Sequence, residues 1–500
     1  MSSRGLIRSM LLTGGAQVVS IGISIVRMKV LALLLGPSGI GLLSLYNSLK
    51  DIAAGTAGLG MGSSSVRQIA NDRADEQALS RVRRVLLAAH LVQGGIAMLA
   101  VWLLRQPISV WLMGTDQFAT EVGLVGVAVF LTLMSVAQTA LLQGMRRIAD
   151  LSRVTVLGAL VATVAGLTAV WLFGQAGLIW FLLAQPLGTV VVAWYFTRRL
   201  PPPTTVRPSL PDLWRVWRPM AQLGAVFMLG TLATAATLLL VRSWITRDLG
   251  LESAGHFAAA WGVSMTYVGF LLTAMSADYY PRLAEVIKDR VATTRLMNDQ
   301  SQLGLAIGGP VLLLLIGLAP WVIRLLYSED FTPAVVLLQW QTVGNIFKLA
   351  SWPMGFAFAA SARSKVSLVV QITWNLLYLL FFAWGLATYG LEITGTAFLA
   401  AYMIYFFVVA ILVRKLYGFR WERLSVRLIG VHAGLAFALL GLSLTLPLAG
   451  AVASVLLALV TGIAGLRVVV RKIGTKGRLT GRIAGVFARL GWPLETDDDT

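Results

Sequence analysis

The sequence predicts an all-α integral membrane protein of about 14 transmembrane helices, built as two parallel six-helix repeats plus two extra C-terminal helices. Apolar residues make up 57% of the 500 residues and charged residues only 13%, whereas an average soluble chain is about 25% charged. About 14 helices of about 20 residues would use roughly 280 residues, which is close to the apolar share of this chain. Lys and Arg also gather in alternate loops, as expected of a chain that crosses a membrane repeatedly.

Fourteen apolar segments are each long enough to cross a hydrocarbon layer about 30 Å thick. The first segment carries Arg27 and Lys29 and continues directly into the turn 35–41, so it is not a cleavable signal peptide. The segments are 10–35, 40–62, 85–104, 122–145, 154–173, 177–197, 219–243, 255–278, 303–326, 333–361, 366–387, 393–413, 428–446 and 450–470.

The Lys and Arg count predicts the topology. With the N-terminus in the cytoplasm, cytoplasmic segments hold 33 of the 41 Lys and Arg, and external loops hold four. Every loop is short enough for the positive-inside rule to apply, so we expect an even number of spans with both termini in the cytoplasm. These loops also explain the net charge of +19, so no nucleic-acid partner is expected.

An internal repeat divides the chain. The stretch 35–41 (LGPSGIG) ends the first helix and opens the second, and 249–255 (LGLESAG) does the same between helices seven and eight, 214 residues later. Each repeat has six helices, an even number, so both halves have the same orientation. The predicted parts are an N-terminal six-helix bundle at 1–200, a cytoplasmic linker at 201–218, a C-terminal six-helix bundle at 219–427, helices 13 and 14 at 428–470, and a basic amphipathic cytoplasmic tail at 471–500.

The composition excludes several kinds of chemistry. The chain has no Cys, which excludes disulfides, thiolate metal sites and Cys nucleophiles. With three His and 22 acidic residues, a metal-rich active site is not expected, and no cofactor is predicted. No loop exceeds about 25 residues and no G-x-x-x-x-G-K-[ST] phosphate loop occurs. The chain is therefore not expected to be an enzyme or to drive transport with ATP by itself.

Four stretches occur in an order and spacing typical of one transporter family. They are 29–41 (KVLALLLGPSGIG), 43–70 with Asn47 and Lys50, 278–283 (DYYPRL), and 323–334 (IRLLYSEDFTPA) followed by 338–348 (LQWQTVGNIFK). On these stretches the chain resembles the lipid-linked oligosaccharide flippases that export O-antigen, common-antigen and exopolysaccharide repeat units. This family lies within the multidrug/oligosaccharidyl-lipid/polysaccharide exporter superfamily, and it often has Asp where this chain has Asn345.

The resemblance implies a flippase of the bacterial inner membrane that works by alternating access. Its substrate would be an oligosaccharide linked through a diphosphate to a polyprenyl carrier such as undecaprenol. The expected partners are this substrate, membrane lipids, and the polysaccharide polymerase and export machinery.

Four cations lie inside predicted helices, namely Arg27, Lys29, Lys50 and Lys348. A charge at the bilayer centre costs about 2.5–3.5 kcal/mol on insertion scales, so these side chains are expected to line a wet cavity. At about 1.5 Å per residue all four lie near the midplane, where only Asp51 offsets them. Arg binds phosphate oxygens with its planar fork and Lys acts as a point charge, so a cationic cavity suits a diphosphate.

Neighbouring polar residues extend this prediction. Asn47 shares a helix face with Lys50, and Asn345 lies one turn from Lys348. Arg27 and Lys29 are separated by about 200° around a helix, so only one of them is expected to point inward.

Other polar and aromatic residues have simpler interpretations. Asp51 is either a coupling-ion site or a structural partner of the nearby cations. Arg242 and Asp278 lie near helix ends. They are either coupling or pairing residues, or their charged groups extend to the membrane interface. The aromatic residues expected in the interfacial belt are Trp111, Trp194, Trp321 and Tyr327.

Other function classes stay open beside the flippase. A multidrug/cation antiporter on the same fold would need several intramembrane acids, and Asp51 is the one clear case in the sequence. A membrane-bound glycosyltransferase or polymerase would need catalytic acids and a substantial external loop, and neither is found. A peptidoglycan-precursor flippase also carries a polyprenyl diphosphate, so the sequence separates it poorly from the favoured class.

Overall fold

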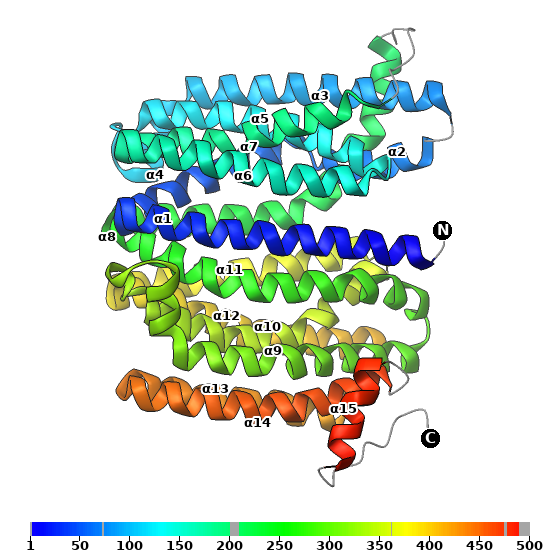
Figure 1. The fold of residues 1–500 in the computed structure, drawn as a ribbon, viewed down its shortest axis with the longest axis vertical. Helices are drawn as coiled ribbons and strands as arrows, with labels where there is room; N and C mark the ends of the chain where they lie inside the picture. Colours follow the sequence, from blue (N-terminus) through cyan, green and yellow to red (C-terminus); the bar gives the residue numbers. More distant parts are fainter. Residues whose placement is uncertain (1–2, 73–74, 201–209, 362, 475–477, 490–500) are drawn as a thin grey trace. The chain divides into compact units, whose positions relative to one another are not determined.

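The computed structural model describes residues 3–72, 75–200, 210–361, 363–474 and 478–489. Within these ranges the chain forms α-helices joined by short turns and contains no β-strand (Figure 1). Residues 201–209 of the predicted linker and 490–500 of the predicted tail lie outside the described residues. The helices are α1 (Ser3–Gly58), α2 (Met61–Asn71), α3 (Glu76–Leu103), α4 (Arg105–Met113), α5 (Ala119–Gly144), α6 (Ile148–Phe173), α7 (Gly177–Thr197), α8 (Leu210–Val286), α9 (Arg290–Leu326), α10 (Ala334–Ala360), α11 (Ser364–Tyr389), α12 (Ile393–Tyr417), α13 (Arg423–Thr445), α14 (Pro447–Ile473) and α15 (Arg478–Arg489).

The helices are long enough for repeated membrane crossings. Nine helical segments of the described chain are sufficiently long and apolar, and four of these are 45 to 53 residues long, which is enough for two crossings each. The 27-residue helix α10 is not among the nine because polar side chains interrupt its apolar sequence. Each of the 14 predicted segments falls mainly on a helix. The predicted fold class, an all-α membrane protein, is confirmed.

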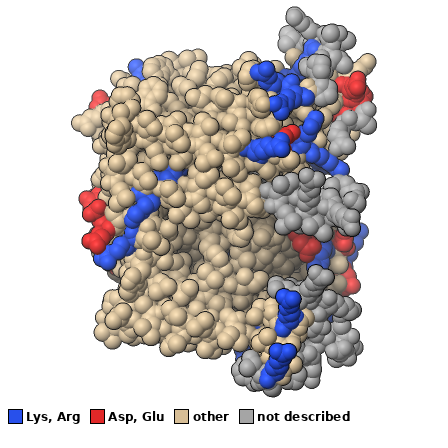
Figure 2. All heavy atoms as spheres, viewed as in Figure 1, with Lys and Arg blue, Asp and Glu red and all other residues tan. Residues whose placement is uncertain are grey.

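The surface has the polarity that a bilayer requires. In the face that Figure 2 shows, Lys, Arg, Asp and Glu are few and lie in small groups, and most of the visible described side chains are uncharged. Large apolar side chains such as Ile96, Val164 and Trp171 are 64 to 73% exposed. Lipid tails are the medium that accommodates so many exposed apolar side chains.

The predicted repeat recurs in the order of the helices. Both α1 and α8 contain two helices that meet at a glycine with positive φ, Gly36 (φ 61°) and Gly250 (φ 87°). Glycine adopts this conformation without the steric cost that a Cβ brings. Later in each half, a 26-residue helix ends at another such glycine, Gly174 (φ 59°) or Gly390 (φ 55°), which starts a three-residue 3₁₀ turn before the next helix.

The residues form two compact units. The first contains Met1–Ala258 and Leu325–Asp330, and the second contains Ala259–Arg324 and Phe331–Thr500. The bundle limits at 1–200 and 219–427 stay a prediction.

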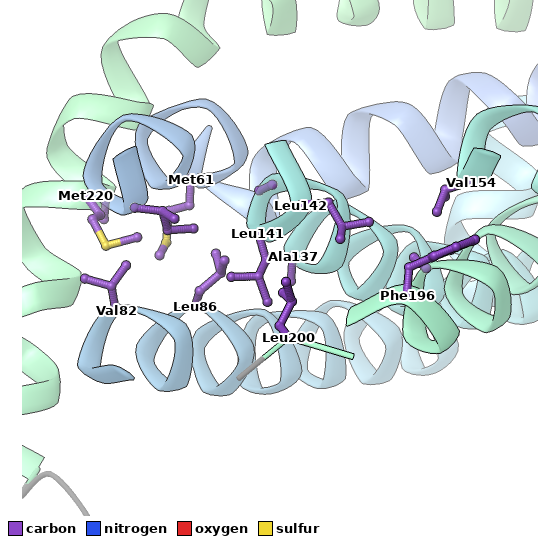
Figure 3. Packing of buried hydrophobic residues seen from close by; sticks show 14 residues of the cluster. Met61, Val82, Leu86, Ala137, Leu141, Leu142, Val154, Phe196, Leu200 and Met220 are labelled. Atoms are coloured by element: carbon purple, nitrogen blue, oxygen red, sulfur yellow. The ribbon is translucent and has the colours of Figure 1, made fainter. Parts of the chain in front are cut away.

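Packing in the first unit joins helices that are far apart in the sequence. Side chains of α2, α3, α5, α6, α7 and the start of α8 form one apolar cluster, in which Met61, Leu86 and Leu142 are completely buried (Figure 3). A Cβ added at Gly60 would overlap the backbone of Gly224, so the turn after α1 lies directly against α8. Small residues at helix contacts permit this close approach of backbones.

The second unit includes the C-terminal helices. Helix α9 lies against α13 and α14 through glycines, because a Cβ at Gly309 would overlap the His432 ring and one at Gly465 would overlap the Ala306 carbonyl. Helix α15 runs across the end of α14 instead of continuing it (Figure 1). Its exposed Arg482 and Arg489 and its buried Phe487 give it the amphipathic character that the sequence predicts.

Candidate functional site

Lys50 lies within a polar group on the second half of α1. Its side chain is only 12% exposed, and its Nζ donates to Asn47 Oδ1 at 3.0 Å. The Asp51 carboxylate lies 3.5 Å from the same Nζ, but the Asp51 side chain is 63% exposed. The structure therefore brings together three predicted site residues, and it gives Asp51 the position of a partly solvated ion-pair partner.

Arg242 contacts the same half of α1 from α8. Its guanidinium donates to the Ser44 carbonyl at 3.3 Å and to the Ser48 hydroxyl. Ser44 and Ser48 are one helical turn apart and buried, so together they hold one nitrogen of the guanidinium. The sequence singled out neither serine.

Arg27 and Lys29 point to different partners in the first unit, as their separation around the helix predicts. The Arg27 guanidinium bonds to Ser24 at 2.8 Å and lies 5.6 Å from the centre of the Phe181 ring. Lys29 Nζ donates to the backbone carbonyl of Tyr327. Neither residue contacts the polar group around Lys50 through a described hydrogen bond.

Tyr327 corrects one expectation. The Trp111, Trp194 and Trp321 side chains are 42 to 55% exposed, as belt residues would be, but Tyr327 is only 5% exposed. Burial raises the pKa of the Tyr327 phenol to about 12, so it stays protonated at neutral pH. The prediction that Tyr327 is a belt residue is wrong, because its side chain is buried inside the protein. Its own backbone carbonyl is the group that Lys29 contacts.

A second polar group lies on one face of α10. Gln341, Asn345 and Lys348 follow each other at intervals of four and three residues, which places them on one side of the helix. Asn345 is fully buried and donates to the Ser264 hydroxyl at 2.8 Å. Its Oδ1 and both amide atoms of Gln341 are buried without a partner among the described residues. Gln341 was missed from the sequence, although its spacing from Lys348 could have identified it.

Lys348 is held by polarisable groups. Its Nζ lies 3.2 Å from the Met265 sulfur and 5.5 Å from the centre of the Tyr402 ring. Tyr402 belongs to an aromatic cluster in which its ring centre lies 5.0 Å from Trp374 and 4.8 Å from Phe398. Such groups stabilise a cation only modestly, which leaves the ammonium able to bind an anion.

Asp278 lies apart from these groups. It is exposed and accepts from Arg282 at 3.0 Å on the same helix, and this ion pair is of the solvent-screened kind. The neighbouring Tyr279 is 1% exposed and donates to the Pro353 carbonyl at 2.8 Å. This bond fastens α8 to α10 within the second unit.

An acidic residue outside the predicted set is placed inside the first unit. One carboxylate oxygen of Glu121, in the first turn of α5, is buried and has no hydrogen-bond partner among the described residues. The predicted span begins at 122, so the apolar pattern leaves Glu121 outside it. A buried polar atom without a partner is costly, so this carboxylate is a further residue to test by substitution.

Comparisons with known proteins point to one family. A family model described as polysaccharide biosynthesis protein matches residues 30–336. A lipid III flippase of Escherichia coli (strain K12) is 24% identical over 409 residues, which cover 80% of this chain and 96% of that protein. The lipid III flippase of Shigella flexneri matches equally well.

Solved transporters share the fold. The lipid II flippase MurJ, in an inward closed conformation, superposes with a TM-score of 0.65 at 13% identity, covering 92% of this chain and 99% of that one. An inward-facing multidrug resistance transporter of the MATE family, in the MOP superfamily, superposes with a TM-score of 0.64 at 17% identity, covering 79% and 94%.

Proposed function

The chain belongs to the polysaccharide biosynthesis protein family, and from that premise we propose that it is a lipid-linked oligosaccharide flippase. It moves polyprenyl-diphosphate-linked repeat units from the cytoplasmic to the periplasmic leaflet of the bacterial inner membrane by alternating access. After the lipid has crossed the membrane, its oligosaccharide is used for surface or exopolysaccharide biosynthesis.

The observation that carries this proposal is the environment of Lys50. An ammonium that is 12% exposed on an apolar membrane helix is costly unless an anion compensates it. Asp51 supplies only part of this compensation because its carboxylate is largely exposed. A diphosphate would complete it. One Asn47 amide hydrogen goes to the Leu43 carbonyl, and the other is left to donate to a phosphate oxygen beside the ammonium.

The second unit holds groups of the same chemistry. Lys348 has soft, neutral neighbours and no described carboxylate partner, so its charge is available to a phosphate. The unpaired amide atoms of Gln341 and Asn345 lie on the same helix face. Buried polar atoms without partners are expensive, and sugar hydroxyls are the kind of group that would satisfy them.

A peptidoglycan-precursor flippase is the second candidate. The likeness to the lipid II flippase MurJ covers 92% of this chain and favours this alternative at the level of the fold. The match to lipid III flippases covers 80% of the chain at higher identity and favours an oligosaccharide other than the peptidoglycan unit. A cation antiporter is less favoured, because Asp51 is exposed and paired with Lys50.

Gene deletion followed by lipid analysis separates these candidates. The proposal predicts that a polyprenyl-diphosphate oligosaccharide accumulates on the cytoplasmic leaflet and that growth continues without surface polysaccharide. Accumulation of the peptidoglycan precursor with cell lysis would instead establish the second candidate. Unchanged lipids together with greater sensitivity to cationic drugs would establish the antiporter.

A further inference from the structure

A cavity of about 490 Å³ lies where four helix ends of the second unit meet. Its lining comes from the end of α8, the start of α9, the turn between α10 and α11, and the end of α12. This volume falls within the range of about 300–1,000 Å³ that small-molecule sites occupy.

The cavity is strongly cationic. Lys288, Arg290 and Arg363 line it, and none of the lining residues is acidic. Among the described residues, none of these three cations takes part in an ion pair. The nearest acid in sequence, Asp289, accepts from the backbone of Val291 at 2.9 Å and caps α9 instead.

The floor of the cavity is polar at one point and apolar elsewhere. The Ser361 and Tyr417 hydroxyls lie 2.5 Å apart, and Tyr417 is 7% exposed. The Arg363 guanidinium is positioned over the Tyr417 ring, 5.8 Å from its centre. The remaining wall is apolar and includes Ile287 and Leu416.

The position of the cavity limits what can bind there. Its lining residues belong to the stretches between predicted spans eight and nine, ten and eleven, and twelve and thirteen, or to the end of span ten. The Lys and Arg count predicts these stretches to be cytoplasmic. The cytoplasmic leaflet carries anionic lipids, and basic pockets between helices bind their headgroups. A soluble anion would use the cations but would leave the apolar wall unfilled.

We propose that this cavity binds the phosphodiester headgroup of an anionic phospholipid from the cytoplasmic leaflet. Lys288, Arg290 and Arg363 contact the phosphate oxygens, and the apolar wall accepts the first part of an acyl chain. The Ser361 and Tyr417 hydroxyls bond to each other and to backbone carbonyls of α10, and they fix the Tyr417 ring beneath Arg363. The cavity shares no lining residue with the groups around Lys50 and Lys348, and the proposal does not depend on the transported substrate.

Native mass spectrometry of the purified full-length protein tests the proposal with phosphatidylglycerol as the probe. The pocket variant Lys288→Gln/Arg290→Gln/Arg363→Gln is compared with Arg414→Gln/Lys415→Gln/Arg420→Gln. This control removes the same charge from exposed residues outside the cavity lining. We expect wild type and control to retain phosphatidylglycerol, and the pocket variant to retain at least about tenfold less.

Two further arms keep the result decisive. Phosphatidylcholine, which has no net charge, should be retained weakly by all three proteins, and Arg363→Gln alone should reduce phosphatidylglycerol retention if the triple variant fails to fold. Equal retention by the pocket and control variants would overturn the proposal. Displacement of the lipid by an equal concentration of inorganic phosphate would assign the cavity to a free anion and overturn the lipid assignment.

Discussion

Gly41 and Gly255 occupy equivalent places in the two repeats, and each packs against the turn that precedes the other. A Cβ added to Gly41 would overlap the Leu251 carbonyl, and one added to Gly255 would overlap the Pro37 carbonyl. Glycine is therefore required at both positions for the two kinked helix pairs to meet at these ends.

Gly255→Ala should weaken this contact. The added methyl group forces the backbones apart, and overpacking of this kind costs about 1–3 kcal/mol. We expect a lower melting temperature and reduced polymer export. The control is Gly269→Ala on the same helix, where a Cβ would have nothing within 4 Å. Equal melting temperatures for the two variants would show that the contact does not stabilise this conformation.

Lys50 should require a positive charge. Replacement by Gln or Ala removes a charge-assisted bond to phosphate worth about 1.5–3 kcal/mol, so export should fall by about 10- to 100-fold without loss of protein. Lys50→Arg should retain more activity than Lys50→Gln. Polymer export and immunoblots in a deletion strain provide the measurement, with exposed Lys415→Gln as control. Wild-type export by Gln variants at both Lys50 and Lys348 would refute the cationic site.

Reporter fusions test the topology. Fusions after Gly174 and Thr388 should report a periplasmic position, and those after Asp150 and Arg363 a cytoplasmic one, because Lys and Arg remain on the cytoplasmic side. Opposite results at any two positions would overturn the predicted orientation.

Membrane potential should drive the transport cycle. Each charge that crosses 100 mV gains or loses about 2.3 kcal/mol, so export of a diphosphate with about two negative charges is favoured by an inside-negative potential. Flipping in proteoliposomes should rise with such a potential at equal pH and sodium, and it should survive Asp51→Asn and Glu121→Gln. A rate that ignores voltage, depends on a pH or sodium gradient and is lost in either variant would indicate ion antiport.

The sequence predicted those features that depend on short-range patterns. The length of the apolar segments identified the helices. The first glycine of each L-G-x-x-x-x-G stretch, Gly36 or Gly250, has a positive φ and is the residue at which two helices meet. The pairing of Lys50 with Asp51 followed from their adjacency.

Long-range contacts escaped prediction because no local pattern encodes them. Tyr327 looked like a belt residue, but burial depends on what packs over it. The Tyr402 ring beside Lys348 is 54 residues away in the chain, and only the packing of α10 against α12 brings the two together. Gln341 is an intermediate case, since its spacing was visible but its unpaired amide was not.

The most direct test of the flippase proposal uses purified protein in proteoliposomes with a labelled polyprenyl-diphosphate oligosaccharide. The sugar that reaches the opposite leaflet is measured with a glycosidase that cannot enter the vesicles. We expect wild-type protein to move the lipid, and the double variant Lys50→Gln/Lys348→Gln to move it at least about tenfold more slowly. Equal rates for wild type, double variant and protein-free vesicles would contradict the proposal.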